Sequence, residues 1–359
     1  MSNKTVMVAM SGGVDSSVAL IKILEAGYNA IGVTMKLSSH GTSTRQDDNS
    51  CCGVDEINGA KLVCDQLGVP HYTIDFQDVF KNTVIDNFAQ EYLKGRTPNP
   101  CVRCNSYVKW DAFIEQADQL DADYIATGHY AIIDSYNNEP AIKQGVDSLK
   151  DQSYVLWGIP KSSIKRTLFP LGELTKNKVR DIARKYNLET AEKPESMEIC
   201  FVADNNYNRF LNDYIPDEMN AIDSGNILNE DNEIVGQHNG YTNYTIGQRK
   251  GIGLSYPDPR YVKSIDSKTN SITISKKANL YREQCYVSGI NWLISEPKLP
   301  LQAKSQIRYN STQVNSEILE NNGKIKVLFD IPQLAVTPGQ SIAFYINDIL
   351  IGGGVIELA

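Results

Sequence analysis

Long apolar runs are missing from this sequence of 359 residues. No stretch approaches the ~18 consecutive apolar residues of a membrane-spanning helix, so we expect no membrane partner. The first ten residues, MSNKTVMVAM, contain one lysine and lead directly into a predicted strand. They resemble neither a signal peptide nor an arginine-rich transit sequence, and the expected location is therefore cytoplasmic.

A surplus of positive charge is also missing, because the formal net charge is −8. This charge argues against a protein that simply coats nucleic acid. The charge is unevenly distributed, however, since residues 150–190 contain nine Lys and Arg against four Asp and Glu. A local basic patch is therefore compatible with the sequence.

The cysteines lack the spacing of a structural zinc site. The chain has seven cysteines, and Cys101 and Cys104 form a C-x-x-C pair. A zinc site would need a second such pair or a histidine at ligand spacing, and Cys51 and Cys52 supply neither. We therefore expect no protein-bound zinc, which leaves catalysis as the main hypothesis for the C-x-x-C pair.

The pattern of elements divides the chain into three parts. Strands and helices alternate in the first part, which predicts a doubly wound α/β domain with helices on both faces of a parallel sheet. Short β-rich runs at roughly ten-residue spacing fill the last part and predict an antiparallel barrel or sandwich, with the barrel preferred. A glycine- and tyrosine-rich region between them is interpreted as a small linking domain. The expected boundaries are 1–205, 206–277 and 278–359.

Within the first part, apolar periodicity and breaker residues give the elements. The expected order is strand 4–9, helix 15–26, strand 29–36, helix 54–67, strand 69–75, helix 76–93, helix 106–120 and strand 123–130. The segment RTPNPCVRCN, residues 96–105, is expected to be a loop because two prolines and two asparagines interrupt a helix.

The segment SGGVDSS, Ser11–Ser17, separates the first strand from the first helix. Gly12 and Gly13 can adopt backbone angles closed to other residues, and the helix that follows directs its positive end toward the loop. These features predict a phosphate site, although the loop lacks the lysine of a Walker A motif. Asp15 fits such a site if it holds Mg²⁺ against phosphate oxygens. The alternative is a plain glycine turn with serines that cap the helix.

This segment resembles the PP-loop of the ATP pyrophosphatase superfamily, whose members cleave ATP between the α and β phosphates. The resemblance implies ATP and Mg²⁺ as cofactors and a catalytic role for Asp15. It assigns the following residues to the nucleotide: Ala9, Met10, Ser11, Gly12, Gly13, Val14, Asp15 and Ser16 in the loop, Met35 at the adenine, and Gly128 in the segment ATGHY.

Further segments narrow the family. GRTPNPCVRCN, ATGHY, KDQSYVLW, ESMEICFV and NYTIGQRKGIG occur in this order and together closely resemble the tRNA-specific 2-thiouridylases. The resemblance implies adenylation of the 2-oxygen of the wobble uridine in a tRNA anticodon. Sulfur from a cysteine persulfide then replaces that oxygen, and AMP and pyrophosphate are released.

By this resemblance Cys200 carries the persulfide, which a sulfur-relay donor protein supplies. Cys104 attacks the persulfide and leaves a Cys104–Cys200 disulfide, or alternatively attacks the base first. Either role needs a thiolate, and Arg103 is the expected source of a positive field. Many relatives have aspartate where this chain has Cys101, which leaves open which thiol of the pair acts. Cys104 is assigned because C-N follows P-N-P at the family's spacing.

The resemblance also implies contacts to the anticodon arm of tRNA. His129 has an alternative as a turn histidine, and the residues of the last domain have the alternative of an ordinary β-surface. The expected contacts are Asn99, Pro100 and Cys101 around the target base, then His129, Lys150, Asp151, Gln152, Arg308, Tyr309 and Gln340.

Two other functions fit parts of the sequence. Another PP-loop ligase, such as an amidating or argininosuccinate-forming synthetase, would use the phosphate loop without needing Cys104 and Cys200. A non-catalytic tRNA-binding protein would keep the loop as a vestige and would form no AMP. Substitutions distinguish these functions from a thiouridylase. Replacement of Cys104 and Cys200 would leave a ligase active, and Asp15→Ala would abolish adenylation in an enzyme while RNA binding persists.

Overall fold

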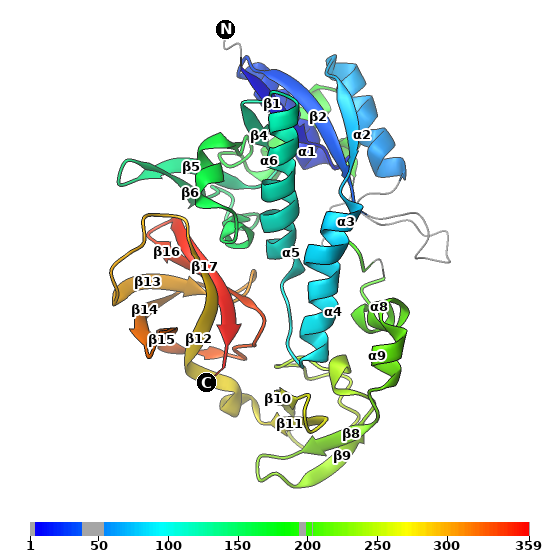
Figure 1. The fold of residues 1–359 in the computed structure, drawn as a ribbon, viewed down its shortest axis with the longest axis vertical. Coiled ribbons are helices and arrows are strands. Elements are labelled where there is room, and N and C mark those ends of the chain that lie inside the picture. Colours follow the sequence, from blue (N-terminus) through cyan, green and yellow to red (C-terminus); the bar gives the residue numbers. More distant parts are fainter. Residues whose placement is uncertain (1–3, 38–53, 194–198, 203, 359) are drawn as a thin grey trace.

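The computed structural model describes residues 4–37, 54–193, 199–202 and 204–358. A five-stranded sheet with strand order β3-β2-β1-β4-β7 begins the chain, and all its neighbouring strands are parallel (Figure 1). Its strands are β1 (Thr5–Ala9), β2 (Asn29–Lys36), β3 (His71–Asp75), β4 (Tyr124–Ala126) and β7 (Thr167–Leu168).

Helices cover both faces of this sheet, because side chains alternate between faces along each strand. Val6 and Val8 pack with the helices of one face, and Met7 packs with those of the other. The first face carries α1 (Val14–Glu25), α2 (Val54–Leu67) and α7 (Lys176–Lys185). The second face carries α3 (Gln77–Phe80), the π-helix η1 (Lys81–Ile85) and α6 (Phe113–Gln119), whereas α4 (Asp86–Leu93) continues beyond the sheet and forms a separate apolar cluster that includes Phe88 and Leu211. The predicted doubly wound α/β architecture is confirmed.

A smaller sheet with strand order β10-β11-β8-β9 follows. It has its own apolar core, which includes Ile227, Val262 and Ile272. Two short helices precede it, α8 (Tyr207–Tyr214) and α9 (Pro216–Asn220). The strands are β8 (Gly225–Leu228), β9 (Ile234–His238), β10 (Tyr261–Asp266) and β11 (Ser271–Ser275).

The last part is an antiparallel barrel, as predicted. Six strands follow one another in the order β12-β15-β14-β13-β16-β17, and pairing of β12 with β17 closes the ring. The strands are β12 (Tyr281–Trp292), β13 (Leu301–Gln306), β14 (Val314–Asn321), β15 (Lys324–Leu334), β16 (Ser341–Ile346) and β17 (Ile349–Glu357). A hairpin from the first part, β5 (Ala131–Tyr136) and β6 (Glu139–Gln144), extends the sheet by pairing with β17.

Short helices complete the chain. They are η3 (Ser153–Leu156), η4 (Lys161–Arg166), η5 (Glu189–Glu192), η6 (Tyr241–Asn243) and η7 (Lys277–Leu280). Among the described residues, every helix is too short or too polar to cross a membrane.

The expected loop 96–105 is wrong from Pro100 onward. There the chain forms α5 (Pro100–Arg103), which continues into the π-helix η2 (Cys104–Ala112). Asn99 caps this helix, since its Oδ1 accepts a hydrogen bond from the amide of Val102 at 3.3 Å. Proline is favoured at the first helical position, where its missing N–H has no helical partner to lose. The residues taken as helix breakers therefore start a helix.

The segment 95–99, which we name the strap, connects the three parts of the molecule. Gly95 lies against Ile265 of the small sheet. The side-chain amide of Gln340, the residue before the barrel strand β16, donates hydrogen bonds to the carbonyls of Thr97 and Pro98 at 3.1 and 3.2 Å. The strap leads directly into the helix that carries Cys101 and Cys104.

Arg96 holds the strap to the barrel. Its guanidinium donates to Glu357 at 2.5 and 2.8 Å and to Glu91 at 2.6 Å. Partial burial opposes ionisation of Glu357, but hydrogen bonds from Arg96 and Ser288 outweigh burial and lower the pKa of this carboxyl. We expect Arg96→Met to reduce the free energy of unfolding by about 1–2 kcal/mol at pH 7, measured by urea unfolding.

This contribution depends on pH. A lowered pKa in the folded state means that the stabilisation is present above the ordinary carboxyl pKa of about 4.3 and is lost as the pH falls through the folded value. The difference between wild type and Arg96→Met should therefore shrink at pH 3. A difference that stays constant between pH 7 and pH 3 would contradict the ionic account. Arg209→Met, which removes an exposed arginine paired with Asp204 and Asp213, is the matched control.

Candidate active site

The loop 11–17 lies at the carboxyl end of β1, in the middle of the parallel sheet. Gly12 has φ of 68°, a left-handed conformation that favours glycine. A Cβ at this position would lie 2.3 Å from the carbonyl oxygen of Glu56. Glycine is therefore required both for the turn and for the close approach of α2.

The serine hydroxyls fold the loop instead of capping the helix. The hydroxyls of Ser16 and Ser17 donate to the carbonyl of Gly13 at 3.0 and 2.9 Å, and the amide of Ser11 donates to the Ser16 hydroxyl at 3.2 Å. Gly13 is the N-cap residue of α1, and the described residues provide no side-chain cap there. This arrangement favours an anion site over a capped glycine turn, because the first amides of the helix stay available.

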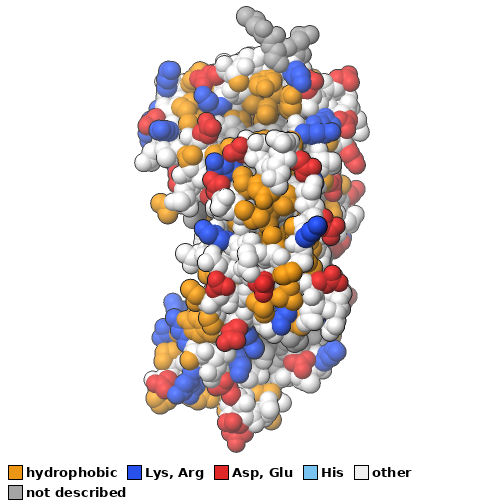
Figure 2. Space-filling view, turned by 90° about the vertical axis from the view of Figure 1, so that its left-hand side faces the viewer, with side chains coloured by type: hydrophobic (Ala, Val, Ile, Leu, Met, Phe, Trp, Pro, Cys, Tyr) orange, Lys and Arg blue, Asp and Glu red, His pale blue; other side chains and the backbone are white. Residues whose placement is uncertain are grey.

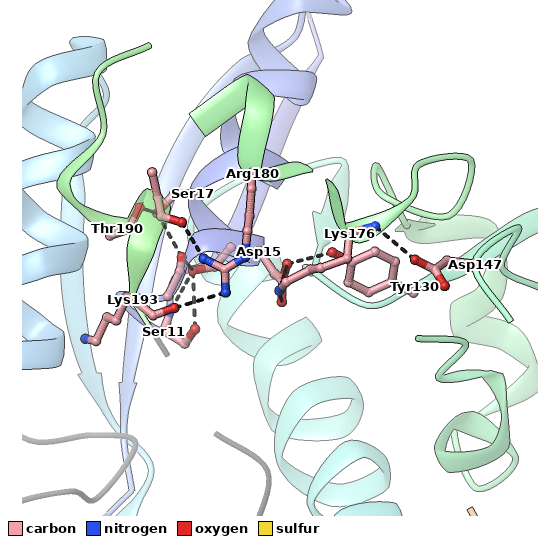
Figure 3. A network of polar contacts seen from close by, with 12 residues as sticks. Ser11, Asp15, Ser17, Tyr130, Asp147, Lys176, Arg180, Thr190 and Lys193 are labelled. Carbon is pink, nitrogen blue, oxygen red and sulfur yellow. Dashed lines mark hydrogen bonds and ion pairs between the residues drawn. The ribbon is translucent and has the colours of Figure 1, made fainter. Parts of the chain in front are cut away.

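Asp15 is held by a lysine that sequence reasoning missed. The ammonium of Lys176 lies 2.8 Å from each carboxylate oxygen of Asp15, and the hydroxyl of Tyr130 donates to the same carboxylate at 2.8 Å (Figure 3). Lys176 begins α7, and its amide donates to Asp147 at 2.9 Å. The side chain of Lys176 is 10 % exposed, so a positive charge is fixed beside the phosphate loop. The basic character of residues 150–190 was the one signal for it in the sequence.

The segment around η5 packs against the same loop. Thr190 donates to the hydroxyl of Ser17 at 3.3 Å (Figure 3). The ammonium of Lys193 lies 3.3 Å from the carbonyl of Gly12. Lys193 also lies 3.4 Å from a carboxylate oxygen of Glu56. A second lysine, again from a distant part of the sequence, thus borders the loop.

The other residues assigned to the nucleotide surround this loop. A Cβ on Gly128 would lie 2.9 Å from the backbone of Asp15, so the segment ATGHY touches the start of α1. Met35, the last residue but one of β2, is buried, and Met10 and Val14 are also buried. Ala9, the last residue of β1, is partly buried. The hypothesis of adenine beside Met35 therefore places the base at the edge of the apolar core.

The two assigned cysteines belong to one apolar cluster. Cys104 opens the π-helix η2 and is buried, whereas Cys200 is half-buried and packs against the cluster that contains Cys104. Cys101, one turn earlier, is exposed. π-Helical segments are frequent at functional sites. Of the motif ESMEICFV, residues 195–198 lie outside the described residues, as do Cys51 and Cys52.

Two other cysteines have environments that keep them protonated. Burial raises the pKa of Cys64 to about 12, with a further contribution from Asp65, and burial alone raises that of Cys285 to about 12. Both thiols therefore stay neutral at physiological pH and are unsuited to nucleophilic attack.

Arg103 does not have the expected orientation. Its Nε donates to the carbonyl of Thr83 at 2.7 Å, and its guanidinium lies 4.8 Å from the centre of the Tyr107 ring. These contacts direct the charge toward η1 and the surface. The expectation that Arg103 supplies the field at Cys104 is therefore not supported by its contacts.

Five of the expected tRNA contacts gather around the buried Tyr154. Its hydroxyl donates to the carbonyl of Ser341 at 2.8 Å, and its ring centre lies 6.3 Å from that of the exposed Tyr309. Burial raises the pKa of Tyr154, while a hydrogen bond with Asn99 and the charge of Arg308 lower it. The five residues are Asn99, Cys101, Arg308, Tyr309 and Gln340, which come from the strap, α5 and the barrel.

Three of the residues assigned to tRNA, Arg308, Gln340 and Pro100, also have structural contacts. Arg308 donates to the carbonyl of Ala335 at 2.5 Å and to the hydroxyl of Thr337 at 2.9 Å. Gln340 binds the strap as described above, and Pro100 is buried at the start of α5. The alternative of an ordinary β-surface does not describe this junction, because it lies between the strap and the barrel.

The segment KDQS turns two of its side chains into the protein. The carboxylate of Asp151 accepts from the amide of Gly145 at 2.9 Å and from the hydroxyl of Ser153 at 2.8 Å. Gln152 accepts from the amide of Tyr130 at 3.1 Å. Asp151 and Gln152 thus position neighbouring backbone, and Lys150 is half-buried beside them.

His129 is a core residue in this structure. It is 7 % exposed, its Nδ1 lies 2.7 Å from the hydroxyl of Thr127, and its ring packs near Trp110 and Phe169. Burial lowers the pKa of His129 well below its ordinary value, with a smaller contribution from Lys109, so the imidazole is neutral. These contacts favour the alternative of a turn histidine over a contact with RNA.

Three domain families match the chain in sequence order. They are described as tRNA methyl transferase HUP domain over residues 4–204, tRNA methyl transferase PRC-barrel domain over 208–276, and aminomethyltransferase beta-barrel domain over 282–356.

Curated relatives match over nearly the whole chain. The tRNA-specific 2-thiouridylase MnmA of Carboxydothermus hydrogenoformans is 45% identical over 361 residues, which cover 99% of this chain and 98% of that protein. The protein of the same name from Symbiobacterium thermophilum is 44% identical, with 99% and 93% covered, and that of Acetivibrio thermocellus is 41% identical, with 99% and 100% covered. With these identities and this coverage, the chain belongs to the family of the tRNA-specific 2-thiouridylases.

Proposed function

We propose that this protein is an ATP-dependent tRNA-uridine 2-sulfurtransferase that acts on the wobble uridine of the anticodon. One observation carries the proposal beyond family membership. A phosphate loop with a lysine-paired aspartate and two cysteines 96 residues apart in sequence are built into the same α/β domain, and the cysteines share one apolar cluster. A ligase without sulfur chemistry would have no use for the second feature.

ATP fits the loop by its donors. The amides at the start of α1, the hydroxyl of Ser11 and the ammonium of Lys176 suit the pyrophosphate, with Met35 and Gly128 bordering the nucleoside. The carboxylate of Asp15 suits Mg²⁺, which prefers oxygen ligands and commonly binds one protein carboxylate together with phosphate oxygens. When bound, the ion neutralises charge that develops on the phosphates.

The sulfur chemistry follows from the uracil carbonyl, whose oxygen is a poor leaving group. The 2-oxygen of the base attacks the α-phosphorus of ATP, the α–β bridging bond breaks, and pyrophosphate leaves. In one path the Cys104 thiolate attacks the inner sulfur of a Cys200 persulfide, which forms the Cys104–Cys200 disulfide and releases hydrosulfide. Hydrosulfide then adds at C2 and AMP leaves. In the other path Cys104 adds to C2 first and AMP leaves. The outer sulfur of the Cys200 persulfide then displaces the Cys104 thiolate from C2. That thiolate attacks Cys200 Sγ, which breaks the S–S bond, leaves sulfur on C2 as 2-thiouridine and forms the Cys104–Cys200 disulfide.

Both paths leave a disulfide that needs an external dithiol for the next turnover, and both need a protein that delivers persulfide sulfur to Cys200. We propose that this donor docks near residues 199–202, where the half-buried Cys200 lies. We also propose a cytoplasmic location for the enzyme. Asn99, Cys101 and Tyr309 are proposed to meet the anticodon arm at the junction around Tyr154.

Mass spectrometry of tRNA nucleosides tests the function. Wild-type protein, Mg-ATP, a persulfide donor, a dithiol and tRNA with an unmodified wobble uridine should yield 2-thiouridine, and Asp15→Ala should yield none. Omission of ATP is the second control. AMP and pyrophosphate without thiouridine would favour another PP-loop ligase, and tRNA binding without AMP would favour a binding protein. A methylated nucleoside, which differs in mass, would indicate transfer of a methyl group instead.

A further inference from the structure

The segment NYTIGQRKGIG forms a basic cavity in the small sheet that the proposed chemistry does not use. The cavity has a volume of about 430 Å³ and is lined by residues of the stretch 249–260. Such a volume is in the range of sites that hold one small group. We name this site the basic cavity.

The loop that forms the basic cavity is anchored at its two ends. The amide of Gly247 donates to the carbonyl of Val262 at 2.8 Å, and the amide of Val262 donates back to Gln248 at 2.9 Å. The side chain of Gln248 accepts from the amide of Thr245 at 3.0 Å, and Ile252 is anchored in the core of the sheet. Gly253 has φ of 79° and open space around it, so glycine serves the turn there rather than packing.

Charge and an aromatic ring meet in the basic cavity. Arg249 and Arg260 both line it, and the guanidinium of Arg260 lies 4.9 Å from the centre of the Tyr256 ring. The adjacent Lys250 is exposed. Guanidinium groups beside an aromatic face can bind phosphate and stack on bases.

Nearby acids leave this positive charge largely uncompensated. Asp258, the acid of the lining, lies 3.5 Å from Lys276. Glu230 lies near Arg260, but its carboxylate already binds Lys263 at 3.0 Å. The basic cavity therefore carries a local positive field on a chain whose net charge is −8.

The distribution of charge elsewhere on the molecule makes this local positive site relevant to RNA binding. On the face shown in Figure 2, Lys and Arg side chains are scattered among Asp and Glu instead of forming one broad basic surface. An acidic protein that binds a polyanion must therefore rely on local basic sites. The basic cavity provides one.

The domain that holds the basic cavity contacts the elements that lead to Cys104. Its loop follows η6, where the hydroxyl of Tyr241 donates to the carbonyl of Leu93 at the end of α4. The strap starts at Gly95, two residues after Leu93, and reaches Pro100 within about 18 Å of extended chain. An RNA that presents a base to Cys104 can therefore contact the small sheet at the same time.

From these observations we propose that the basic cavity binds the phosphate backbone of the tRNA substrate, with Arg249 and Arg260 as the phosphate ligands. The inference rests on the proposed function and adds to it a site for the RNA away from the reacting base. Such contacts position the RNA and carry no sequence information.

Binding of a wobble-uridine tRNA transcript, measured by filter retention between about 50 and 200 mM salt, tests the proposal. Arg249→Gln with Arg260→Gln should weaken binding at least about tenfold and reduce the slope of log affinity against log salt by about two. Lys268→Gln with Lys277→Gln removes the same charge from exposed positions of the same domain and should leave both quantities unchanged. Arg249→Lys with Arg260→Lys should retain most of the slope, which separates charge from folding.

Kinetics supply the second readout. Removal of a contact made equally in ground and transition states should raise KM for tRNA and leave kcat unchanged at saturating tRNA. The proposal would be overturned if Arg249→Gln with Arg260→Gln bound tRNA as tightly as the control Lys268→Gln with Lys277→Gln. So would a loss of affinity for the sulfur donor alone, which would identify a protein-docking site. Failure of the proposed function itself gives a different result from failure of this inference. In that case even the wild-type protein would form no thiouridine in the thiolation assay.

Discussion

Cys200→Ser is expected to lower the rate of tRNA thiolation by at least about a thousandfold while ATP-dependent pyrophosphate release continues. A serine hydroxyl has nearly the shape of the thiol but cannot carry a transferable sulfur. Adenylation uses the phosphate loop and the uracil oxygen, so it does not depend on this side chain. Single-turnover measurement of pyrophosphate and of 2-thiouridine in the same samples separates the two steps.

Cys104→Ser should give the same loss, because each proposed path uses its thiolate. Cys101→Ser is the matched control: it makes the same atomic change one helical turn away, at an exposed position. Because Cys101 is exposed and neither proposed path uses its thiol, we expect Cys101→Ser to retain thiolation within about tenfold. If Cys101→Ser lost activity and Cys104→Ser kept it, the roles in the C-x-x-C pair would be exchanged. Full thiolation by Cys200→Ser would refute the carrier role.

The elements that follow simple periodicity were predictable from the sequence. The parallel strands β1 and β2 are buried on both faces and so read as apolar runs, and the bounds predicted for β2 and α2 agree with the structure. The position of the loop 11–17 between β1 and α1 was predictable because its glycines and serines act through local backbone geometry. Features that depend on local backbone geometry can therefore be predicted from the nearby sequence.

Elements stabilised by distant partners were missed. The strand β14 reads VNSEILEN, which has several polar residues, and it is ordered by pairing with β13 and β15. The hairpin β5–β6 had a signal that was not used, since Asn137 and Asn138 both have positive φ, as its tight turn requires. Pro100 was interpreted as a breaker, although an asparagine before a proline also starts a helix.

The candidate site could be outlined from the sequence where its residues are adjacent, and not where they converge through the fold. Lys176 is 161 residues from Asp15, and no spacing rule relates them. The absence of lysine from the loop itself is explained by this arrangement. The fold delivers the positive charge from α7 instead of from α1, beside the anion site.

From the position of Lys176 we expect a second large mutational effect, on the rate of pyrophosphate release. Lys176→Met should lower the rate of ATP-dependent pyrophosphate release by about 10²–10³, because the positive charge beside the phosphates is lost while side-chain length is kept. The rate at saturating ATP should fall more than the affinity for ATP, since charge on the leaving pyrophosphate grows in the transition state. Lys178→Met, an exposed lysine two residues further along α7, is the matched control and should behave as wild type.

A structural role for Lys176 makes a different prediction. If the lysine served only to neutralise Asp15, then Asp15→Asn would relieve the unpaired charge and Lys176→Met with Asp15→Asn would recover stability in thermal unfolding. Activity would stay absent in that double variant, because Asp15 is itself proposed to act on the nucleotide. The deciding variant is therefore Lys176→Arg, which keeps the charge but changes its geometry. Partial recovery of pyrophosphate release by arginine, with a folded methionine variant that remains inactive, would assign Lys176 to the phosphates. Wild-type rates in the methionine variant would show that the ion pair with Asp15 has no part in the reaction.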